Sequence, residues 1–318
     1  MSGTFRFMSG SFFAGILCMK EFLSFVSRFD SLEIHYSVFI PEREPVAVLQ
    51  ILHGMCGCKE RFMPFMEFMA EHGIVCFAND HRGHGNSIWN DSDLGYMYDG
   101  GYKALIDDVG QMNSIARNRF PDLPLFILGH SMGSLALRTY LKYSTESPSG
   151  VILCGSPSYN KAAPMARLLT SALCKAGLDR FRPVLIQSLT SFFYNRNFRP
   201  EGSKAWLCSD PIVRNKFLND PKTNFLFTFN GADALLNMMY ETYSDYDTVS
   251  SDYPVLFLSG ADDPCMNGID GLQEAVETMR KAGFAEVAYK LYPAMRHEIL
   301  NEIGKERVWQ DILEFVCS

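Results

Sequence analysis

The feature that most constrains the fold lies near the middle of the chain, where an apolar run meets a serine between two glycines. Residues 125–128 have the pattern of a buried strand, and an amphipathic helical pattern begins at Leu135. Between them stands a G-x-S-x-G motif centred on Ser131. A strand, this motif and a helix in that order predict a nucleophile elbow, a tight turn that holds the serine hydroxyl above the edge of a sheet. Glycine fits at both ends of the turn because side chains there would collide with neighbouring backbone. The elbow comprises Gly129, His130, Ser131, Met132 and Gly133.

Strand and helix patterns alternate on both sides of the elbow. The expected strands are residues 22–29, 33–40, 46–52, 74–78, 125–128, 151–154, 253–259 and 286–292. The expected helices are residues 61–72, 102–119, 269–282 and 307–316, together with the helix after the elbow. Such alternation predicts an α/β fold with a mostly parallel central sheet and helices on both of its faces.

The alternation stops between residues 157 and 252, where no buried strand pattern is present. This segment consists of short helical or irregular pieces that are rich in aromatic residues. It fits a second helical layer with its own core, or a lid that lines an apolar pocket, and the two descriptions are compatible. Because it follows a sheet strand, it would emerge at the edge where open α/β sheets bind ligands. We therefore expect a core of residues 22–156 and 253–318, with a helical lid of residues 157–252 inserted in it.

Residues 1–21 precede the first expected strand and are interpreted as a disordered extension. The apolar run at residues 12–19 is too short to span a bilayer. No small-x-small cleavage site follows this run, which argues against a secretory signal. A signal peptide or membrane anchor is the alternative interpretation, and Met19 could serve as the true start of the protein.

The overall composition is that of a globular protein and excludes several classes of partner. The chain carries a formal net charge of −7 and is 47% apolar. This charge leaves no basic footprint for nucleic acid or for an anionic membrane. Nine cysteines at irregular spacing do not indicate a disulfide framework. The closest pair, Cys56 and Cys58, has no further ligands nearby in the sequence. We therefore expect no metal site, reduced thiols and a cytoplasmic location.

A serine nucleophile needs a base, and the base needs an acid that orients it. Among seven histidines, His297 is the best candidate for the base because it follows the last expected strand, late in the chain. His130, beside the nucleophile, should point away from it. Asp262 and Asp263 both follow the penultimate strand, where the acid of this topology should lie. Spacing alone does not separate the two aspartates.

An acyl-transfer reaction also needs two backbone N–H groups to hold the oxyanion. One is expected from Met132, directly after the nucleophile. The other is expected from the loop after the strand that ends at His53 and Gly54, with Met55 as the best candidate. A His-Gly pair is a weak motif alone, so its place in the order of elements carries this assignment.

Five segments spread along the chain carry a resemblance to a known family. They are His53-Gly54-Met55 with Glu60-Arg61-Phe62 downstream, Asp80-His81-Arg82-Gly83-His84-Gly85-Asn86-Ser87, Gly129-His130-Ser131-Met132-Gly133, Gly260-Ala261-Asp262-Asp263 and Arg296-His297-Glu298. Together they resemble the monoacylglycerol lipase and lysophospholipase branch of the α/β-hydrolase superfamily, over about residues 22–318. The resemblance implies the α/β-hydrolase fold, and it places the acid on Asp263 and the oxyanion donors on Met55 and Met132. It also implies that the D-x-R-G-H-G-x-S loop is structural.

One departure from the family lies beside the expected oxyanion loop. Residues 56–59, Cys-Gly-Cys-Lys, stand where many members have a Gly-Glu-His type stretch. This difference could alter the mouth of the pocket or make the site sensitive to oxidation.

The sequence therefore predicts a serine ester hydrolase that uses no cofactor and forms an acyl-enzyme intermediate. Ser131 is the predicted nucleophile, His297 the base and Asp263 the acid. The expected substrates are small lipid esters, monoacylglycerols or lysophospholipids, and the lid would allow transient contact with a membrane or micelle. Alternatives are an aminopeptidase, a haloperoxidase-like enzyme or an acyltransferase. A catalytically inactive binding protein of the same fold is the alternative from another class. The sequence leaves the head group, the acyl acceptor and the oligomeric state open.

Overall fold

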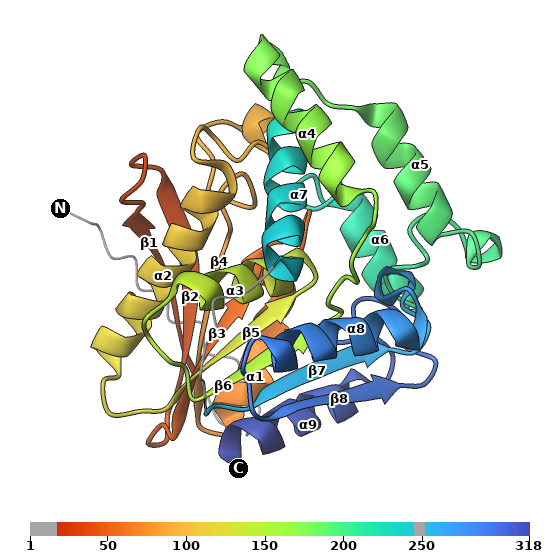
Figure 1. Ribbon diagram of the computed structural model, residues 1–318. Helices are drawn as coiled ribbons and strands as arrows, with labels where there is room; N and C mark the ends of the chain where they lie inside the picture. Colours follow the sequence, from red (N-terminus) through yellow and green to blue (C-terminus); the bar gives the residue numbers. More distant parts are fainter. Residues whose placement is uncertain (1–17, 245–251) are drawn as a thin grey trace.

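The computed structural model describes residues 18–244 and 252–318, which form an eight-stranded sheet with helices on both faces (Figure 1). The strand order is β1-β2-β4-β3-β5-β6-β7-β8. β2 pairs antiparallel with both β1 and β4, and the other neighbours are parallel. The predicted mostly parallel sheet is confirmed. The strands are β1 (Cys18–Val26), β2 (Glu33–Pro41), β3 (Ala47–Leu52), β4 (Ile74–Asn79), β5 (Leu125–His130), β6 (Gly150–Cys154), β7 (Val255–Gly260) and β8 (Val287–Tyr292).

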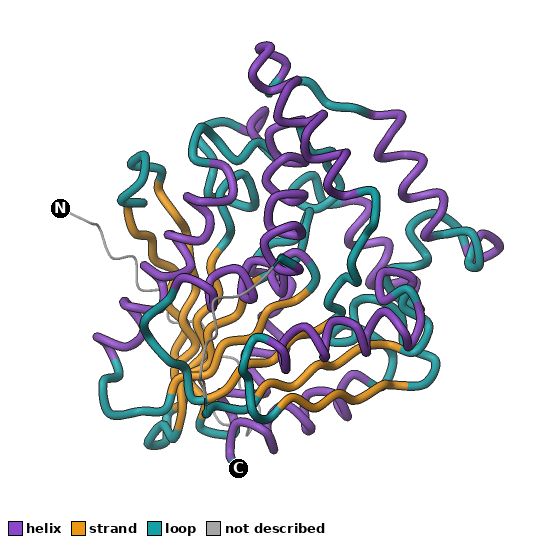
Figure 2. Tube along the Cα trace, viewed as in Figure 1, coloured by secondary structure: helices purple, strands orange, loops and turns teal. Residues whose placement is uncertain are grey.

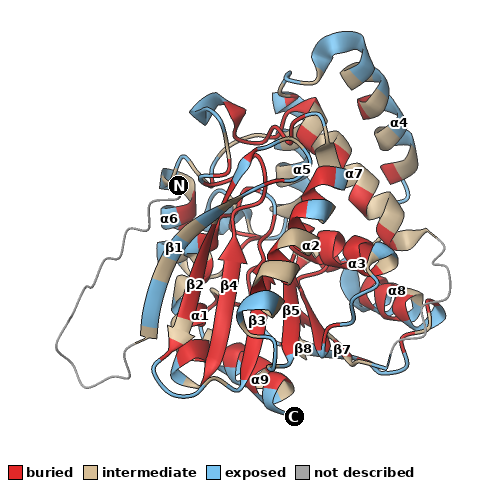
Figure 3. Ribbon diagram, turned by 90° about the vertical axis from the view of Figure 1, so that its left-hand side faces the viewer, coloured by how far each residue is buried: buried red, intermediate tan, exposed pale blue. Residues whose placement is uncertain are grey.

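The central strands are buried on both faces because their alternate side chains enter two separate cores (Figure 3). In β3, for example, Leu49 and Ile51 belong to one core, whereas Val48 and Leu52 belong to the other. This burial explains why the strands have continuous apolar sequences. The first core lies under α1 (Met63–Glu71) and α9 (Lys305–Cys317), and the second lies under α2 (Gly101–Arg119), α3 (Met132–Tyr143) and α8 (Gly268–Lys281).

The segment between β6 and β7 is helical, and we call its described part, residues 157–244, the cap. It contains α4 (Ala163–Leu173), a π-helical turn (Cys174–Leu178), α5 (Val184–Tyr194), α6 (Pro211–Asn219) and α7 (Phe229–Tyr243). α7 packs on α3, where the buried Thr242 hydroxyl donates to the Leu135 carbonyl at 3.2 Å. α4 and α5 stand farther from the sheet (Figures 1 and 2). Within the described ranges, no helix is both long and apolar enough to cross a bilayer.

The first strand begins earlier than the sequence pattern predicts. β1 starts at Cys18 and pairs with β2 from Cys18 opposite Pro41 to Val26 opposite Glu33. Residues 18–21, expected to be the end of a disordered extension, therefore belong to the sheet, and the expectation for residues 1–17 lies outside the described residues. The pattern misses this start because an edge strand is half-exposed and needs little apolar sequence. The strand also ends at residue 26 rather than 29, since the Ser27 N–H turns back to the Leu32 carbonyl.

The helix expected at residues 61–72 has two parts. A 3-10 turn covers Lys59–Phe62, and α1 begins only at Met63. Pro64 lies in the first turn of α1, where its missing N–H costs no hydrogen bond. The 3-10 turn thus connects the loop after β3 to α1.

Candidate active site

The elbow between β5 and α3 places Ser131 in a backbone conformation with positive φ. Ser131 has φ of 53° and ψ of −119°, which residues with side chains rarely adopt. A Cβ atom at Gly129 would lie 2.5 Å from the Gly133 carbonyl oxygen. One at Gly133 would lie 2.2 Å from the Leu52 carbonyl oxygen. Neither position has room for a side chain, so the two glycines allow the turn that lifts Ser131 above the sheet.

Three side chains from separate loops meet beside the elbow. Nε2 of His297 lies 2.8 Å from Ser131 Oγ, and Nδ1 of the same ring lies 2.9 Å from an Asp263 carboxylate oxygen. Asp263 follows β7 and His297 follows β8, and each residue is only 3% exposed. The neighbouring Asp262 is exposed, and its N–H donates to the Met295 carbonyl. The structure therefore brings Asp263, and not Asp262, to the histidine ring.

The His297 and His130 rings, which both lie near Ser131, have pKa values shifted in opposite directions. Burial opposes a charge on His297, but the adjacent Asp263 and Cys265 side chains together outweigh burial and raise the pKa of His297 well above its usual value. Burial lowers the pKa of His130 to about 4, so this ring stays neutral. The His130 Nε2–H donates to the His297 carbonyl at 3.2 Å. His130 therefore holds the loop that carries His297, and its ring is turned to that loop.

The two expected oxyanion donors belong to two segments that meet at the elbow. The Met132 N–H is the first of α3, where helix N–H groups have no intrahelical partner. Met55 lies in the loop after β3, which packs so tightly that a Cβ at Gly54 would be 2.9 Å from Ser131 Cβ. The Cys56 N–H in the same loop is already used, since it donates to His84 at 3.3 Å. The assignment of Met55 and Met132 as the oxyanion donors stays a prediction.

The glycine-rich loop after β4 supports the site through buried polar contacts. Asp80 accepts hydrogen bonds from the N–H groups of Lys59 (2.8 Å) and Asn86 (2.9 Å), and it pairs with Lys59 Nζ at 2.6 Å. A Cβ at Gly85 would lie 2.2 Å from Asp80 Cγ. Arg82 is fully buried and ion-paired. These contacts fix the loops at the sheet edge. None of the five residues that make them lines the pocket at Ser131.

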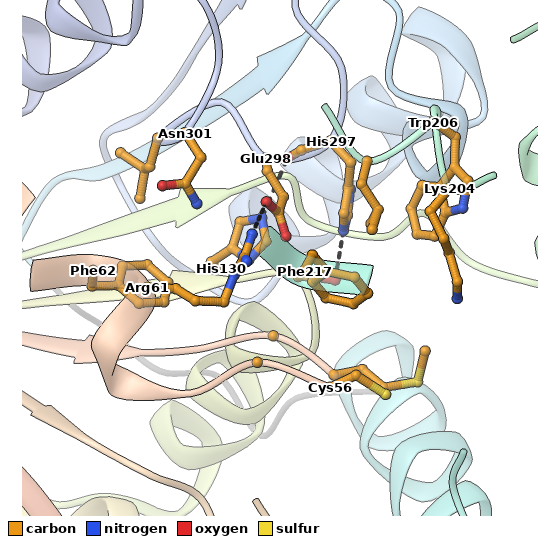
Figure 4. Close-up of a pocket in the computed structure, with 16 residues that line it drawn as sticks. Cys56, Arg61, Phe62, His130, Lys204, Trp206, Phe217, His297, Glu298 and Asn301 are labelled. Atoms are coloured by element: carbon orange, nitrogen blue, oxygen red, sulfur yellow. Dashed lines mark hydrogen bonds and ion pairs between the residues drawn. The ribbon is translucent and has the colours of Figure 1, made fainter. Parts of the chain in front are cut away.

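A cavity of about 60 Å³ opens at Ser131 between the sheet edge and the cap (Figure 4). The ring of Trp206, from the cap, lies with its centroid 5.2 Å from that of His297. Arg61 and Glu298 form an ion pair in the wall. Ligand pockets commonly measure about 300–1,000 Å³, so a bound acyl chain requires the lining to move apart. The apolar lining includes Phe62, Trp206, Leu207, Phe217 and Leu300.

Several residues of the site are not identified by sequence reasoning. The Arg61–Glu298 pair joins two segments of the family resemblance, but a separation of 237 residues gives no sign of the contact. Trp206 is one of many aromatic residues in the cap, and no local feature distinguishes it. Cys265 lies beside the predicted acid and base, and ligand atoms of Asp263, Cys265 and His297 all lie within 4.8 Å of one another.

Comparison with known proteins gives one family match that covers most of the chain. Residues 43–304 match the family described as serine aminopeptidase, S33. A monoacylglycerol lipase of Mycolicibacterium smegmatis is 25% identical over 288 residues, which cover 90% of this chain and 94% of the lipase. A monoglyceride lipase homolog of Monkeypox virus is 26% identical, over 91% of this chain and 96% of the viral protein.

Solved structures give the same result for the fold. A thermostable carboxyl esterase from Bacillus coagulans, in complex with glycerol, superimposes with a TM-score of 0.84 at 26% identity, covering 94% of this chain and 98% of the esterase. A soluble variant of the monoglyceride lipase from Saccharomyces cerevisiae superimposes with a TM-score of 0.71 at 19% identity, covering 91% and 92% of the two chains. The predicted α/β-hydrolase fold and the predicted likeness to monoacylglycerol lipases are confirmed.

Proposed function

Because the chain belongs to the serine aminopeptidase, S33, family of α/β-hydrolases, we propose that it is a serine hydrolase that cleaves carboxylic esters of lipids. The proposed substrates are monoacylglycerols or lysophospholipids. The observation that carries the proposal is the hydrogen-bonded series from Ser131 through His297 to Asp263, at 2.8 and 2.9 Å. The relatives named monoacylglycerol lipase support the choice of ester.

The proposed mechanism has two steps. Ser131 Oγ attacks the ester carbonyl carbon while His297 Nε2 accepts the hydroxyl proton. The oxyanion accepts hydrogen bonds from the Met55 and Met132 N–H groups, and Asp263 stabilises the imidazolium. When the C–O bond breaks, His297 returns the proton to the departing alcohol. A water molecule then attacks the acyl-enzyme by the same proton transfers, which releases the fatty acid and restores Ser131.

An aminopeptidase is the main alternative, since it is the activity that the family's description names. A carboxylate side chain in the pocket is the favourable partner for the charged amino group of such an enzyme's substrate. Glu298 is the carboxylate side chain that lines the cavity, and its ion pair with Arg61 already occupies it. This pairing disfavours a peptide whose free amino terminus would need the Glu298 carboxylate.

The proposed function is tested with an ester series that runs from acetyl to palmitoyl chains on glycerol and phosphocholine heads. We expect hydrolysis to rise toward the long acyl chains, and Ser131→Ala to abolish both hydrolysis and labelling by a fluorophosphonate probe. Ser147→Ala, at an exposed serine, is the matched control and should keep full activity. Activity that survives in Ser131→Ala would contradict the mechanism. A preference for acetyl esters or for aminoacyl amides would contradict the assignment of lipid esters as substrates.

We also propose that the cap contacts a membrane or micelle while substrate enters. α4 and α5 each expose an apolar stripe at helical spacing. The exposed side chains are Met165, Leu168 and Leu169 on α4, and Leu185, Leu189, Phe192 and Phe193 on α5. A lipid surface is the proposed partner of these exposed side chains, because the proposed substrates reside in lipid aggregates. The same cap lines the cavity through Trp206 and Phe217.

A further inference from the structure

A cysteine that the hydrolytic mechanism does not use lies against its acid and base. Cys265 follows Asp263 by two residues, in the 3-10 turn Pro264–Met266 after β7. A carboxylate oxygen of Asp263, the Cys265 sulfur and a nitrogen of His297 lie within 4.8 Å of one another. Among the described residues, this is the one group of three or more such side chains at that spacing. The Tyr194 hydroxyl, from the cap, also contacts the Cys265 thiol.

The three donors are already held in place by the fold. One Asp263 oxygen accepts the Cys265 N–H at 2.8 Å, and the other faces Nδ1 of His297 at 2.9 Å. Pro264 fixes the backbone between the two ligands on the turn. The His130 ring holds the His297 carbonyl at 3.2 Å from the other side. The three donor atoms therefore already lie within 4.8 Å of one another before any ion binds.

The chemistry of the donors selects among metal ions. One carboxylate oxygen, one thiolate sulfur and one imidazole nitrogen are the ligand types of Zn²⁺, and three protein ligands leave a fourth position for water. Mg²⁺ and Ca²⁺ prefer oxygen ligands and do not match a thiolate. Asp263 and His297 are each 3% exposed, so a bound ion would be largely shielded from water.

We propose that Asp263, Cys265 and His297 form a Zn²⁺ site whose occupation switches off ester hydrolysis, an inference that rests on the proposed function. The ion takes the lone pair of Nδ1, so the neutral ring carries its proton on Nε2 instead. Cys265 loses its thiol proton to solvent and binds as thiolate, and Asp263 binds through its carboxylate. With a proton on Nε2, His297 cannot accept the hydroxyl proton of Ser131, and the nucleophile is not activated. The Cys265 thiol proton is released for each ion bound, a second proton leaves Nδ1 where the ring is protonated beforehand, and no group is oxidised or reduced.

The first measurement is inhibition of ester hydrolysis by zinc chloride, after treatment with a chelator. Each variant's rate is expressed relative to its own metal-free rate, because Cys265 touches the base. We expect zinc to inhibit the wild type, magnesium to have no effect, and the chelator to restore the rate. Cys265→Ala and Cys265→Ser should require about 10-fold more zinc or higher, since even an outer-shell partner of a metal site contributes 10–100-fold to affinity. Cys174→Ala, at a partly buried cysteine of the cap, is the matched control and should behave like the wild type.

The second measurement follows zinc binding without turnover, by competition with a chelating dye, in Ser131→Ala. We expect one ion bound with release of the Cys265 thiol proton, and weaker binding in the double variant Ser131→Ala/Cys265→Ala. Zinc inhibition unchanged in Cys265→Ala, or equal binding by the two Ser131→Ala proteins, would overturn the site. If the wild type hydrolyses no ester but Ser131→Ala still binds zinc through Cys265, the proposed function fails while the site is supported. If hydrolysis proceeds and zinc binding does not depend on Cys265, the function stands and this inference fails.

Discussion

Ser131 shows how a single strained residue is maintained by the groups around it. Its φ of 53° is costly for a residue with a side chain, by about 1–3 kcal/mol. The Ser131 N–H donates to the Cys154 carbonyl at 2.9 Å, which ties the turn to β6. Gly129 and Gly133 let the strand and helix approach closely enough to fix the turn. The conformation is thus set by contacts on both sides, and the hydroxyl is held toward His297 without rearrangement.

The two neighbouring aspartates should differ sharply when each is changed to asparagine. Asp263→Asn should lower kcat by up to about 10⁴-fold, because the amide cannot stabilise the imidazolium or fix its tautomer. Asp262→Asn should keep kcat near that of the wild type, since Asp262 is exposed and lies away from the ring. Steady-state hydrolysis of a monoacylglycerol by the two variants is the measurement. Loss of kcat in Asp262→Asn, with activity retained in Asp263→Asn, would identify Asp262 as the acid instead.

The residues that could be predicted from the sequence are those fixed by local motifs and by element order. Ser131 lies in a turn motif, and His297 follows the last strand, so both can be named before the structure is known. The choice between Asp262 and Asp263 needs either the family resemblance or the burial that distinguishes them in three dimensions. Arg61, Glu298 and other distant partners could not be paired, because their contact arises only when the strands are assembled.

Secondary structure is most predictable where an element is buried. The strands from β3 to β7 have continuous apolar sequences, and their predicted positions lie within two residues of those observed. β1 was placed four residues late, since one face of an edge strand is open to water and its pattern is weak. In the cap, the helices could be expected as a class, but their bounds and packing depend on contacts with α3 and with the core.

The loop after β4 should make folding stability depend on pH through His84. Burial lowers the pKa of His84 to about 4, although the Arg82 carbonyl and Asp80 act in the opposite direction. The unfolded chain binds a proton near pH 6.5, whereas the folded ring stays neutral until about pH 4. The contribution of a neutral His84 is therefore complete above pH 6.5 and is lost as the pH falls to about 4. For this ring the loss amounts to up to about 3 kcal/mol.

Urea unfolding from about pH 7.5 to about pH 4.5 measures this contribution. The free energy of unfolding should fall with decreasing pH less steeply in His84→Gln than in the wild type, even if the variant is less stable overall. His35→Gln, at a half-exposed ring, controls for the loss of a histidine as such. Equal slopes for His84→Gln and the wild type would show that His84 does not carry the dependence.

At the scale of the whole molecule, the core and the cap contribute different parts of the candidate site. The core places Ser131, Asp263 and His297 at the ends of three parallel strands, so their geometry is tied to the sheet. The cap supplies the apolar wall through Trp206 and Phe217. The cavity of about 60 Å³ is too small for an acyl chain, so the cap and the loops around it must separate during binding. A lipid surface that takes up the apolar faces of α4 and α5 would favour that separation.

This arrangement predicts that vesicle binding depends on the cap and on apolar contact rather than on charge. Leu185 and Phe193 on α5 are 73% and 61% exposed. Changing both to serine should weaken binding to zwitterionic vesicles roughly tenfold or more, because each side chain loses on the order of 1 kcal/mol of apolar burial.

Hydrolysis of a dissolved short-chain ester by this double variant should change little, since neither residue lines the cavity. Val46→Ser, at an exposed valine directly before β3, should bind vesicles like the wild type. Because the chain carries a net charge of −7, adding anionic lipid should not strengthen binding. Co-sedimentation that is unchanged in the double variant, or that appears only with anionic lipid, would contradict an apolar cap contact.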